Sequence, residues 1–244
     1  MENKKVNTET NKEVMIECKN LTKAYNGFKA LDNLNLDIVK GEIFAFVGHN
    51  GAGKTTTMNL LVGLIEPTSG DAFISGHSII KDPIEVKKII GFLPENVNLY
   101  SGLTARQTVK YIADLNGGVA ENKIDETLDR VGLEKVKDKR AGEFSKGMKQ
   151  RLGIACVLVK DPEVLFLDEP TSGLDPTGKM EVQDLLKKLG DEGITIFYAS
   201  HILGEVEDIA DRVGILYQGK LQKILGKDEI EKVGEIYKEI SVVV

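Results

Sequence analysis

The chain of 244 residues has only two cysteines, no long apolar run and no excess of positive charge. Cys18 and Cys156 lie far apart in apolar surroundings, so we expect buried free thiols in a reducing compartment, with no disulfide and no cysteine metal site. No apolar stretch approaches the roughly 18 residues that a membrane-spanning helix needs. The net charge of -6 argues against a nucleic-acid partner.

The ends of the chain and its composition indicate one main domain. Residues 1–12 are polar and lack the apolar core of a signal peptide, so we expect a flexible tail and a cytoplasmic protein. The hydrophobic content of 41% suffices for one domain with a large core. No internal repeat and no long linker divides the sequence.

The most informative stretch is 48–55, Gly-His-Asn-Gly-Ala-Gly-Lys-Thr, which fits the phosphate-binding loop pattern GxxxxGK[ST]. An apolar run over 43–47 predicts a buried strand before the loop, and 54–65 predicts a helix after it. Glycines let successive N–H groups point into one hollow, and the helix N-terminus adds positive potential there. Lys54 supplies a charge for the β- and γ-phosphates, and the Thr55 hydroxyl suits Mg²⁺. A glycine-rich turn that merely caps a helix would not require this full pattern with these flanks.

Apolar runs elsewhere indicate an α/β protein. Helical patterns dominate 104–159 and recur at 176–189 and 227–240. Strands are expected at 14–18, 34–38, 72–75, 89–93, 164–167 and 194–198, with a turn at 67–71 and a hairpin over 213–221. This alternation predicts a parallel sheet with a helical lobe inserted in the middle of the chain.

Candidate catalytic residues follow two of the buried runs. Asp168 ends the run 164–167 and can hold Mg²⁺ through water, while Glu169 can polarise an attacking water as a general base. Without the phosphate loop, such an acidic pair would indicate no more than the start of a helix. His201 follows the run 194–198 at the strand end where ligands bind in α/β sheets, so its ring could reach a γ-phosphate.

With these motifs in this order, the chain resembles the ATP-binding cassette (ABC) ATPases over about residues 14–224. Residues 48–55 resemble the Walker A motif, and 164–169 resemble Walker B with its catalytic glutamate. Residues 172–175 resemble the D-loop. Residues 144–151, Phe-Ser-Lys-Gly-Met-Lys-Gln-Arg, resemble the signature region that distinguishes this family from other phosphate-loop enzymes.

The resemblance implies an α/β fold of the P-loop NTPase (RecA-like) type, with a parallel sheet core, an antiparallel β subdomain and an inserted α-helical subdomain over about 95–160. The ATPase domain would span 13–225, after the flexible tail over 1–12. A helical extension over 226–244 would follow and would pack on the cassette or on its twin.

The resemblance also implies a site for ATP and Mg²⁺. Glu169 would be the catalytic base and His201 the switch histidine. The Mg²⁺ ligands would be Thr55, Glu95 and Asp168. The residues expected to bind ATP are Tyr25, Gly48, His49, Asn50, Gly51, Ala52, Gly53, Lys54, Thr55, Thr56, Ser145 and Gly147.

Two positions depart from the usual family pattern. In the signature region Lys146 and Met148 stand where the family has Gly and Gln, while Ser145 and Gly147 keep the hydroxyl and the close backbone approach. Glu95 stands where the family more often has Gln; it keeps an acceptor for a Mg²⁺-bound water but adds negative charge. Both departures resemble cassettes that pair with ABC-2-type export permeases, including drug, antibiotic and sodium exporters.

Members of this family work as pairs that sandwich two ATP molecules. Ser145 and Gly147 would therefore act in trans on the partner's γ-phosphate, and Tyr25 would stack on adenine. The resemblance implies a separate transmembrane permease and a second cassette, identical or paralogous, with the chain peripheral on the inner face of the cell membrane. The alternative is a soluble ABC ATPase in a non-transport assembly complex.

Overall fold

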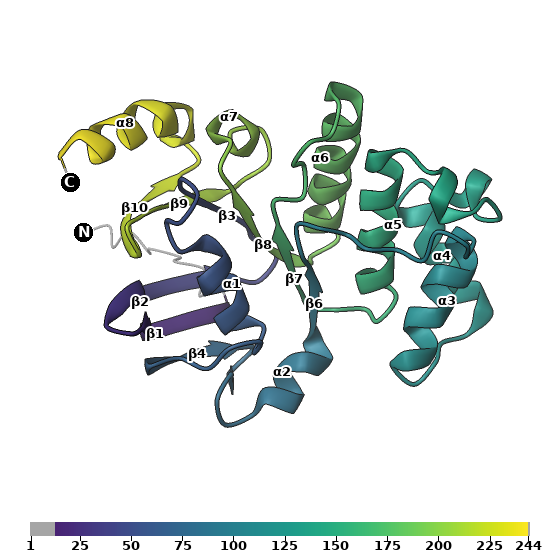
Figure 1. The fold of residues 1–244 in the computed structure, drawn as a ribbon, viewed down its shortest axis with the longest axis horizontal. Coiled ribbons are helices and arrows are strands. Elements are labelled where there is room, and N and C mark those ends of the chain that lie inside the picture. Colours follow the sequence, from purple (N-terminus) through teal and green to yellow (C-terminus); the bar gives the residue numbers. More distant parts are fainter. Residues whose placement is uncertain (1–12, 244) are drawn as a thin grey trace, which may run out of the picture.

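The computed structural model describes residues 13–243, so the tail expected over 1–12 lies outside the described part. Two sheets form the body, and three helices, α3 to α5, stand together at one side of it (Figure 1). The last helix, α8, lies at the opposite side (Figure 1). Within 13–243, no helix has the length and apolar character that crossing a membrane requires.

The larger sheet has six strands. In spatial order they are β10 (Lys220–Gly226), β9 (Arg212–Tyr217), β3 (Ile43–Val47), β8 (Thr195–Ser200), β7 (Val164–Asp168) and β6 (Ile90–Leu93). All neighbours pair in parallel except β9 and β10, which form the expected hairpin. The parallel strands β3, β7 and β8 are buried along their whole length, which explains their unbroken apolar sequences.

The second sheet is antiparallel and has four strands, in the order β2, β1, β4 and β5. Their bounds are β1 (Val14–Tyr25), β2 (Phe28–Val39), β4 (Ser69–Ile74) and β5 (His77–Ser78). A two-residue turn joins β1 to β2, and both of its residues, Asn26 and Gly27, have positive φ. This Asn-Gly pair suits the type I′ turn that matches the twist of a hairpin.

Some helices pack against the larger sheet, whereas α3 and α4 pack on α5. The bounds of the helices are α1 (Lys54–Leu61), α2 (Pro83–Ile89), α3 (Ala105–Leu115), α4 (Glu121–Arg130), α5 (Lys146–Leu158), α6 (Pro176–Asp191), α7 (Leu203–Val206) and α8 (Val233–Val243). Short 3₁₀ segments lie at Glu134–Val136, Ala141–Glu143 and Ile230–Lys232. The helical insertion expected in the middle of the chain is thus present between β6 and β7.

Alternate side chains of the buried strands supply two cores. Ala45 and Val47 of β3 pack with the helices of the insertion, whereas Phe44 and Phe46 face the other way. Both rings pack against Phe197, at centroid separations of 5.8 and 5.5 Å, and Phe166 packs against the same ring at 5.7 Å, in the core shared with the antiparallel sheet. The position of β3 between both cores fixes the loop that follows it.

Several expected boundaries were wrong. β1 and β2 are longer than the runs 14–18 and 34–38, because they continue as a half-exposed hairpin where only one face is apolar. The turn expected at 67–71 overlaps the start of β4. The run 89–93 contains the end of a helix, α2, which begins with a proline at its first position and was not expected.

Candidate functional site

The loop between β3 and α1 is closely packed against neighbouring backbone. A Cβ added at Gly48 would lie 2.5 Å from the Leu216 carbonyl oxygen. At Gly53, φ is +111° and an added Cβ would lie 2.5 Å from the carbonyl oxygen of Ala30. Only glycine fits at these two positions, so this loop conformation depends on the two glycines of the motif. The result is a cradle that opens at the N-terminus of α1, where N–H groups attract anions.

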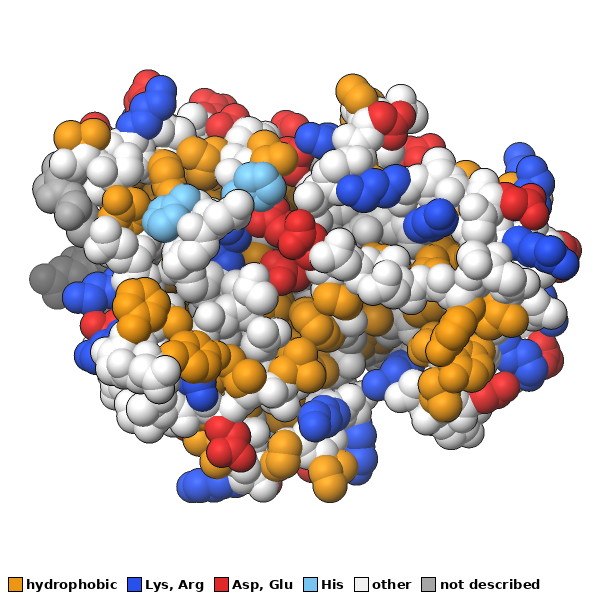
Figure 2. Space-filling model, in the orientation of Figure 1, with side chains coloured by type: hydrophobic (Ala, Val, Ile, Leu, Met, Phe, Trp, Pro, Cys, Tyr) orange, Lys and Arg blue, Asp and Glu red, His pale blue; other side chains and the backbone are white. Residues whose placement is uncertain are grey.

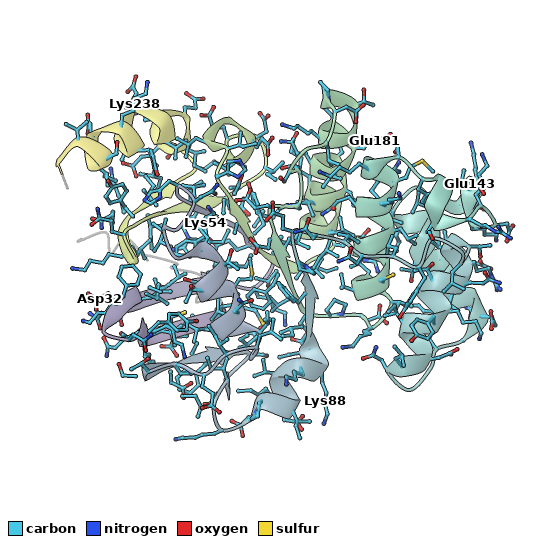
Figure 3. All side chains as sticks on the ribbon, in the orientation of Figure 1. Asp32, Lys54, Lys88, Glu143, Glu181 and Lys238 are labelled. Carbon is cyan, nitrogen blue, oxygen red and sulfur yellow. The ribbon has the colours of Figure 1, made fainter. Side chains whose placement is uncertain are left out.

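Lys54 begins α1 and turns its side chain back beneath the loop. Its Nζ donates to the Gly48 carbonyl oxygen at 2.7 Å and lies 3.5 Å from Oε1 of Glu169. The residue is only 6% exposed, and Figure 3 places it in the middle of the molecule. The buried ammonium is therefore held between the loop and the end of β7.

Asp168, at the end of β7, faces the start of α1. Its Oδ2 accepts a hydrogen bond from the Thr55 hydroxyl at 3.2 Å. Its Oδ1 is buried and has no hydrogen-bond partner within the described residues. Burial raises the pKa of this carboxyl above its ordinary value, with further repulsion from Glu169 and Glu95. A buried acceptor without a partner, beside a hydroxyl, is the kind of oxygen set that Mg²⁺ or its bound water prefers.

Glu169 lies next to Asp168 but points toward a histidine. Its Oε2 accepts from the backbone N–H of His201 at 3.2 Å and lies 2.8 Å from the Nδ1 atom of that ring. Because a carboxylate only accepts, Nδ1 carries the hydrogen, which leaves Nε2 free to contact another group. β7 and β8 are neighbours in the sheet, so their C-terminal ends bring the glutamate and the histidine together.

A cavity of about 340 Å³ joins these groups. Its lining residues are Ala30, Asn50, Gly51, Gly53, Lys54, Thr55, Thr56, Glu95, Glu169 and His201. In Figure 2 histidine and carboxylate side chains gather beside one another on this face of the molecule. The structure thus brings Glu95, from the segment after β6, to the same cavity as the loop and the histidine.

Not every residue expected at the site lines this cavity. Gly48 and His49 line a smaller adjoining cavity of about 280 Å³, and Ala52 is fully buried beneath the loop. Tyr25 lies at the tip of the first hairpin, 46% exposed and paired across the turn with Phe28. It does not line the cavity, although Ala30 of the same hairpin does.

Ser145 and Gly147 lie at the start of α5, away from the cavity-lining set. The Ser145 hydroxyl accepts from the Met148 backbone N–H at 3.2 Å and so caps the helix. A Cβ added at Gly147 would lie 3.3 Å from the Cα of Gly178 in α6, so the glycine permits close helix packing. Within one chain, these residues do not meet the phosphate loop.

Two contributors to this region were not expected from the sequence. Ala30 touches the loop because the first hairpin folds over it. Tyr237 of α8 bonds to the loop: its hydroxyl accepts from the His49 backbone N–H at 2.9 Å. The Asn-Gly pair indicates a hairpin in the sequence, and that hairpin brings Ala30 to the loop. No local pattern indicates the Tyr237 contact, since it joins residues 188 positions apart.

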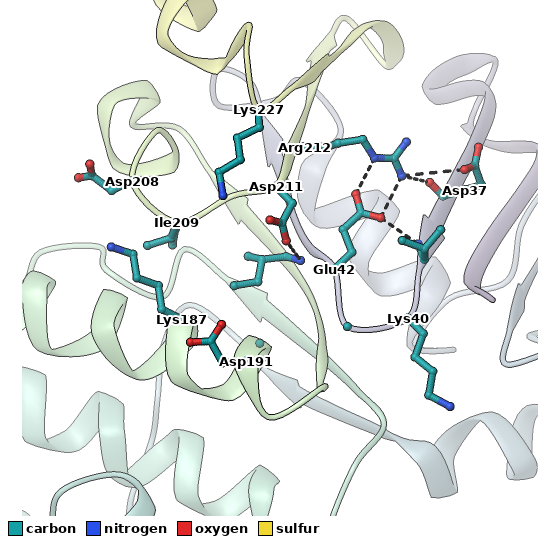
Figure 4. A pocket seen from close by; sticks show the side chains of 14 residues that line it. Asp37, Lys40, Glu42, Lys187, Asp191, Asp208, Ile209, Asp211, Arg212 and Lys227 are labelled. Carbon is teal, nitrogen blue, oxygen red and sulfur yellow. Dashed lines mark hydrogen bonds and ion pairs between the residues drawn. The ribbon is translucent and has the colours of Figure 1, made fainter. Parts of the chain in front are cut away.

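A larger cavity of about 790 Å³ lies at the opposite end of β3, and Figure 4 shows the charged side chains around it. Glu42 accepts two hydrogen bonds from Arg212, at 2.6 and 3.1 Å, and a third from the Val39 backbone N–H. Asp211 accepts from the Ile43 backbone N–H at 2.9 Å. Glu42, Asp211 and Arg212 satisfy one another and the backbone, so this part of the cavity wall is structural.

Comparison with known proteins gives sequence relatives in two antibiotic transport systems. The chain is 45% identical to the bacitracin transport ATP-binding protein BcrA of Bacillus licheniformis, over 93% of this chain and 74% of that protein. It is 40% identical to the lantibiotic transport ATP-binding protein SrtF of Streptococcus pyogenes, over 91% of this chain and 96% of that protein.

Solved structures agree with these relatives. The cbiO1 subunit of an ABC transporter complex from Clostridium perfringens superposes with a TM-score of 0.83 and 32% identity, over 94% of this chain and 95% of that one. A dimeric ATP-binding cassette in a post-hydrolysis state, bound to ADP and Pi, gives a TM-score of 0.77 and 29% identity, over 87% and 99% of the two chains.

The family model described as ABC transporter matches residues 31–172. This range includes the phosphate loop, the helical insertion and the end of β7. The expected fold class is confirmed by the solved cassettes, whose architecture this chain shares. The chain therefore belongs to the ABC transporter family, as an ATP-binding cassette with the fold of an ABC ATPase.

Proposed function

We propose that this ABC ATPase hydrolyses ATP in the 340 Å³ cavity between the phosphate loop and the ends of β7 and β8. The observation that carries the proposal is the convergence of Lys54, Glu169 and His201 on one cavity, with the distances given above. Lys54 and the backbone of residues 48–56 bind the phosphates. Glu169 orients and polarises the attacking water, and the Nε2 atom of His201 contacts the γ-phosphate.

The oxygen set beside the loop fits a magnesium ion. Thr55 and Asp168 would hold it, and Glu95 would accept from one of its water molecules, because Asp168 at the end of β7 and Glu95 after β6 both lie near Thr55 at the start of α1. When bound, Mg²⁺ neutralises phosphate charge in the developing transition state. Tyr25 at the exposed hairpin tip stacks on adenine.

The remaining site residues act on a second cassette. Ser145 and Gly147 lie away from their own chain's cavity, which is what residues serving a partner's nucleotide require. A related cassette is dimeric in a state that holds ADP and Pi. We therefore place Ser145 and Gly147 against the γ-phosphate bound by the other cassette, with closure of the pair coupled to a separate membrane permease.

The relatives favour an exporter of peptide antibiotics. Proteins 45% and 40% identical to this chain carry bacitracin and lantibiotic transport in their names. Bacitracin and lantibiotics are both peptides, so the cargo we propose is a peptide antibiotic that the permease recognises. The chain then lies on the inner face of the cell membrane through that permease. The non-transport alternative has no comparable support among these relatives.

Chromosomal replacement of Glu169 by Gln in the source cell tests the transport role. The variant cassette should bind ATP without hydrolysing it, so cells should become more susceptible to bacitracin or to a lantibiotic. The measurement is the minimal inhibitory concentration of each peptide, beside that of a small non-peptide antibiotic as the control. Equal susceptibility to both peptides in variant and parent would contradict the cargo class. Normal ATP turnover in the purified variant would contradict the site itself.

A further inference from the structure

The last helix of the chain contacts both loops that frame the proposed ATP site. Ile236, Tyr237 and Ile240 of α8 pack against the main core, which anchors the helix on the domain. Tyr237 lines the 280 Å³ cavity together with His49 of the phosphate loop and with His201 and Leu203 of the segment after β8. The helix α8 therefore lies beside both the phosphate loop and the segment after β8.

Tyr237 connects this helix to the phosphate loop at His49, through the peptide that joins Gly48 to His49. The His49 N–H donates to the Tyr237 hydroxyl at 2.9 Å. The carbonyl oxygen of the same peptide, that of Gly48, accepts from Nζ of Lys54 at 2.7 Å. In the next peptide, the His49 carbonyl oxygen accepts from the Ala52 N–H at 3.0 Å and lies 3.4 Å from Nζ of Lys54. The His49 ring Nδ1 lies 2.7 Å from the Asn50 carbonyl oxygen, so Nδ1 carries the hydrogen in that contact.

We propose that Tyr237 is a positioning residue for ATP binding, which acts by fixing the Gly48–His49 peptide. A hydrogen bond at the His49 N–H restricts rotation of this peptide, and the carbonyl oxygen of the same peptide, that of Gly48, accepts from the phosphate-binding lysine at 2.7 Å. The Tyr237 hydroxyl thus holds the phosphate loop in its binding conformation before ATP binds. Less conformational entropy is then lost when ATP binds. Tyr237 touches neither phosphate nor the attacking water.

The proposal rests on the proposed role of residues 48–56 as the phosphate site. Tyr237→Phe keeps the ring in the core and removes only the hydroxyl. Loss of one hydrogen bond of ordinary strength corresponds to a rise of about 3- to 10-fold in the KM and Kd for ATP. We expect kcat to stay within about twofold, because the catalytic groups themselves are unchanged.

Tyr217→Phe is the matched control. The Tyr217 ring packs edge-on against the His49 ring at 5.2 Å, but within residues 13–243 its hydroxyl makes no hydrogen bond. This variant should leave KM and kcat unchanged. Steady-state kinetics, ATP titration with a fluorescent analogue and thermal melting are measured for both variants. A lower melting temperature with an unchanged KM in Tyr237→Phe would overturn the proposal, as would equal shifts in KM for both variants.

Lys54→Ala separates this proposal from the site assignment on which it rests. Loss of nucleotide binding in Lys54→Ala with an unchanged KM in Tyr237→Phe would overturn only the role of the helix. Unchanged nucleotide affinity in Lys54→Ala would instead contradict the phosphate loop assignment.

Discussion

Glu169 is held in a backbone conformation that residues other than glycine seldom adopt, with φ at +50°. Its own N–H donates to the Ala199 carbonyl oxygen, and its carbonyl oxygen accepts from Ser172, which fixes the strained unit from both sides. The side chain is thereby aimed at Lys54 and His201. Strain of this kind concentrates at functional sites, and here it coincides with the residue to which we assign the general base.

The proposed site residues could be predicted from the sequence because each lies at the end of an unbroken apolar run. Asp168 ends β7, and Glu169 and His201 directly follow β7 and β8, whose C-terminal ends meet at one edge of the sheet. His49 was expected among the ATP ligands on its place in the motif alone. The structure shows a hydrogen bond from its N–H to Tyr237, a contact that only the tertiary fold creates, and its role toward ATP stays a prediction.

The two cysteines allow a prediction about single residues. Burial raises the pKa of both Cys18 and Cys156 to about 12, so neither forms a thiolate near neutral pH. The native protein should therefore not react with Ellman's reagent at pH 8, and both thiols should react after denaturation. Absorbance of the released thiolate measures this directly. A thiol that reacts rapidly in the folded protein would contradict the burial of that cysteine.

At the scale of elements, parallel strands were easier to predict than the antiparallel hairpin. β3, β7 and β8 are buried on both faces, so their sequences stand out as apolar runs. In β1 the buried positions are irregularly spaced, and its pairing with β2 contains several register shifts, so a period of two is obscured in that strand. The short helix α2 was not predicted because it has seven residues and buries only Val86, which leaves too few apolar positions to show a helical period.

At the start of α5, Ser145 caps the helix, and we propose that it also contacts the partner's nucleotide; substitution can separate these two roles. As the cap of α5 it accepts from the Met148 N–H, so Ser145→Ala should lower the free energy of unfolding by about 1 kcal/mol. Ser145→Asp keeps a good cap and suits the positive helix N-terminus, so its stability should match the parent. Its carboxylate would nevertheless repel the partner's phosphate and reduce ATP turnover by about tenfold or more.

Chemical denaturation and steady-state ATPase assays on the two Ser145 variants test this separation. Turnover at the parental rate in Ser145→Asp would show that the serine serves only as a helix cap. A large loss of stability in that variant would contradict the capping argument instead.

At the scale of the whole molecule, the residues proposed to act on ATP lie in two separate places on one chain. The cavity at the phosphate loop holds Lys54, Glu169 and His201, whereas Ser145 and Gly147 lie on the helical insertion. A head-to-tail pair of cassettes would complete each ATP site with the other chain's signature residues. This arrangement couples nucleotide binding to a change in the relative position of two chains, which a permease can use.

The most direct test of this account is single-turnover and steady-state ATP hydrolysis by Glu169→Gln, with light scattering to follow the mass of the protein in ATP and Mg²⁺. Removing the general base while keeping the phosphate cradle should slow turnover by about 10² or more. ATP binding should stay intact, and a stable dimer should accumulate. Near-normal hydrolysis by this variant would contradict the assignment of Glu169 as the base and with it the proposed site.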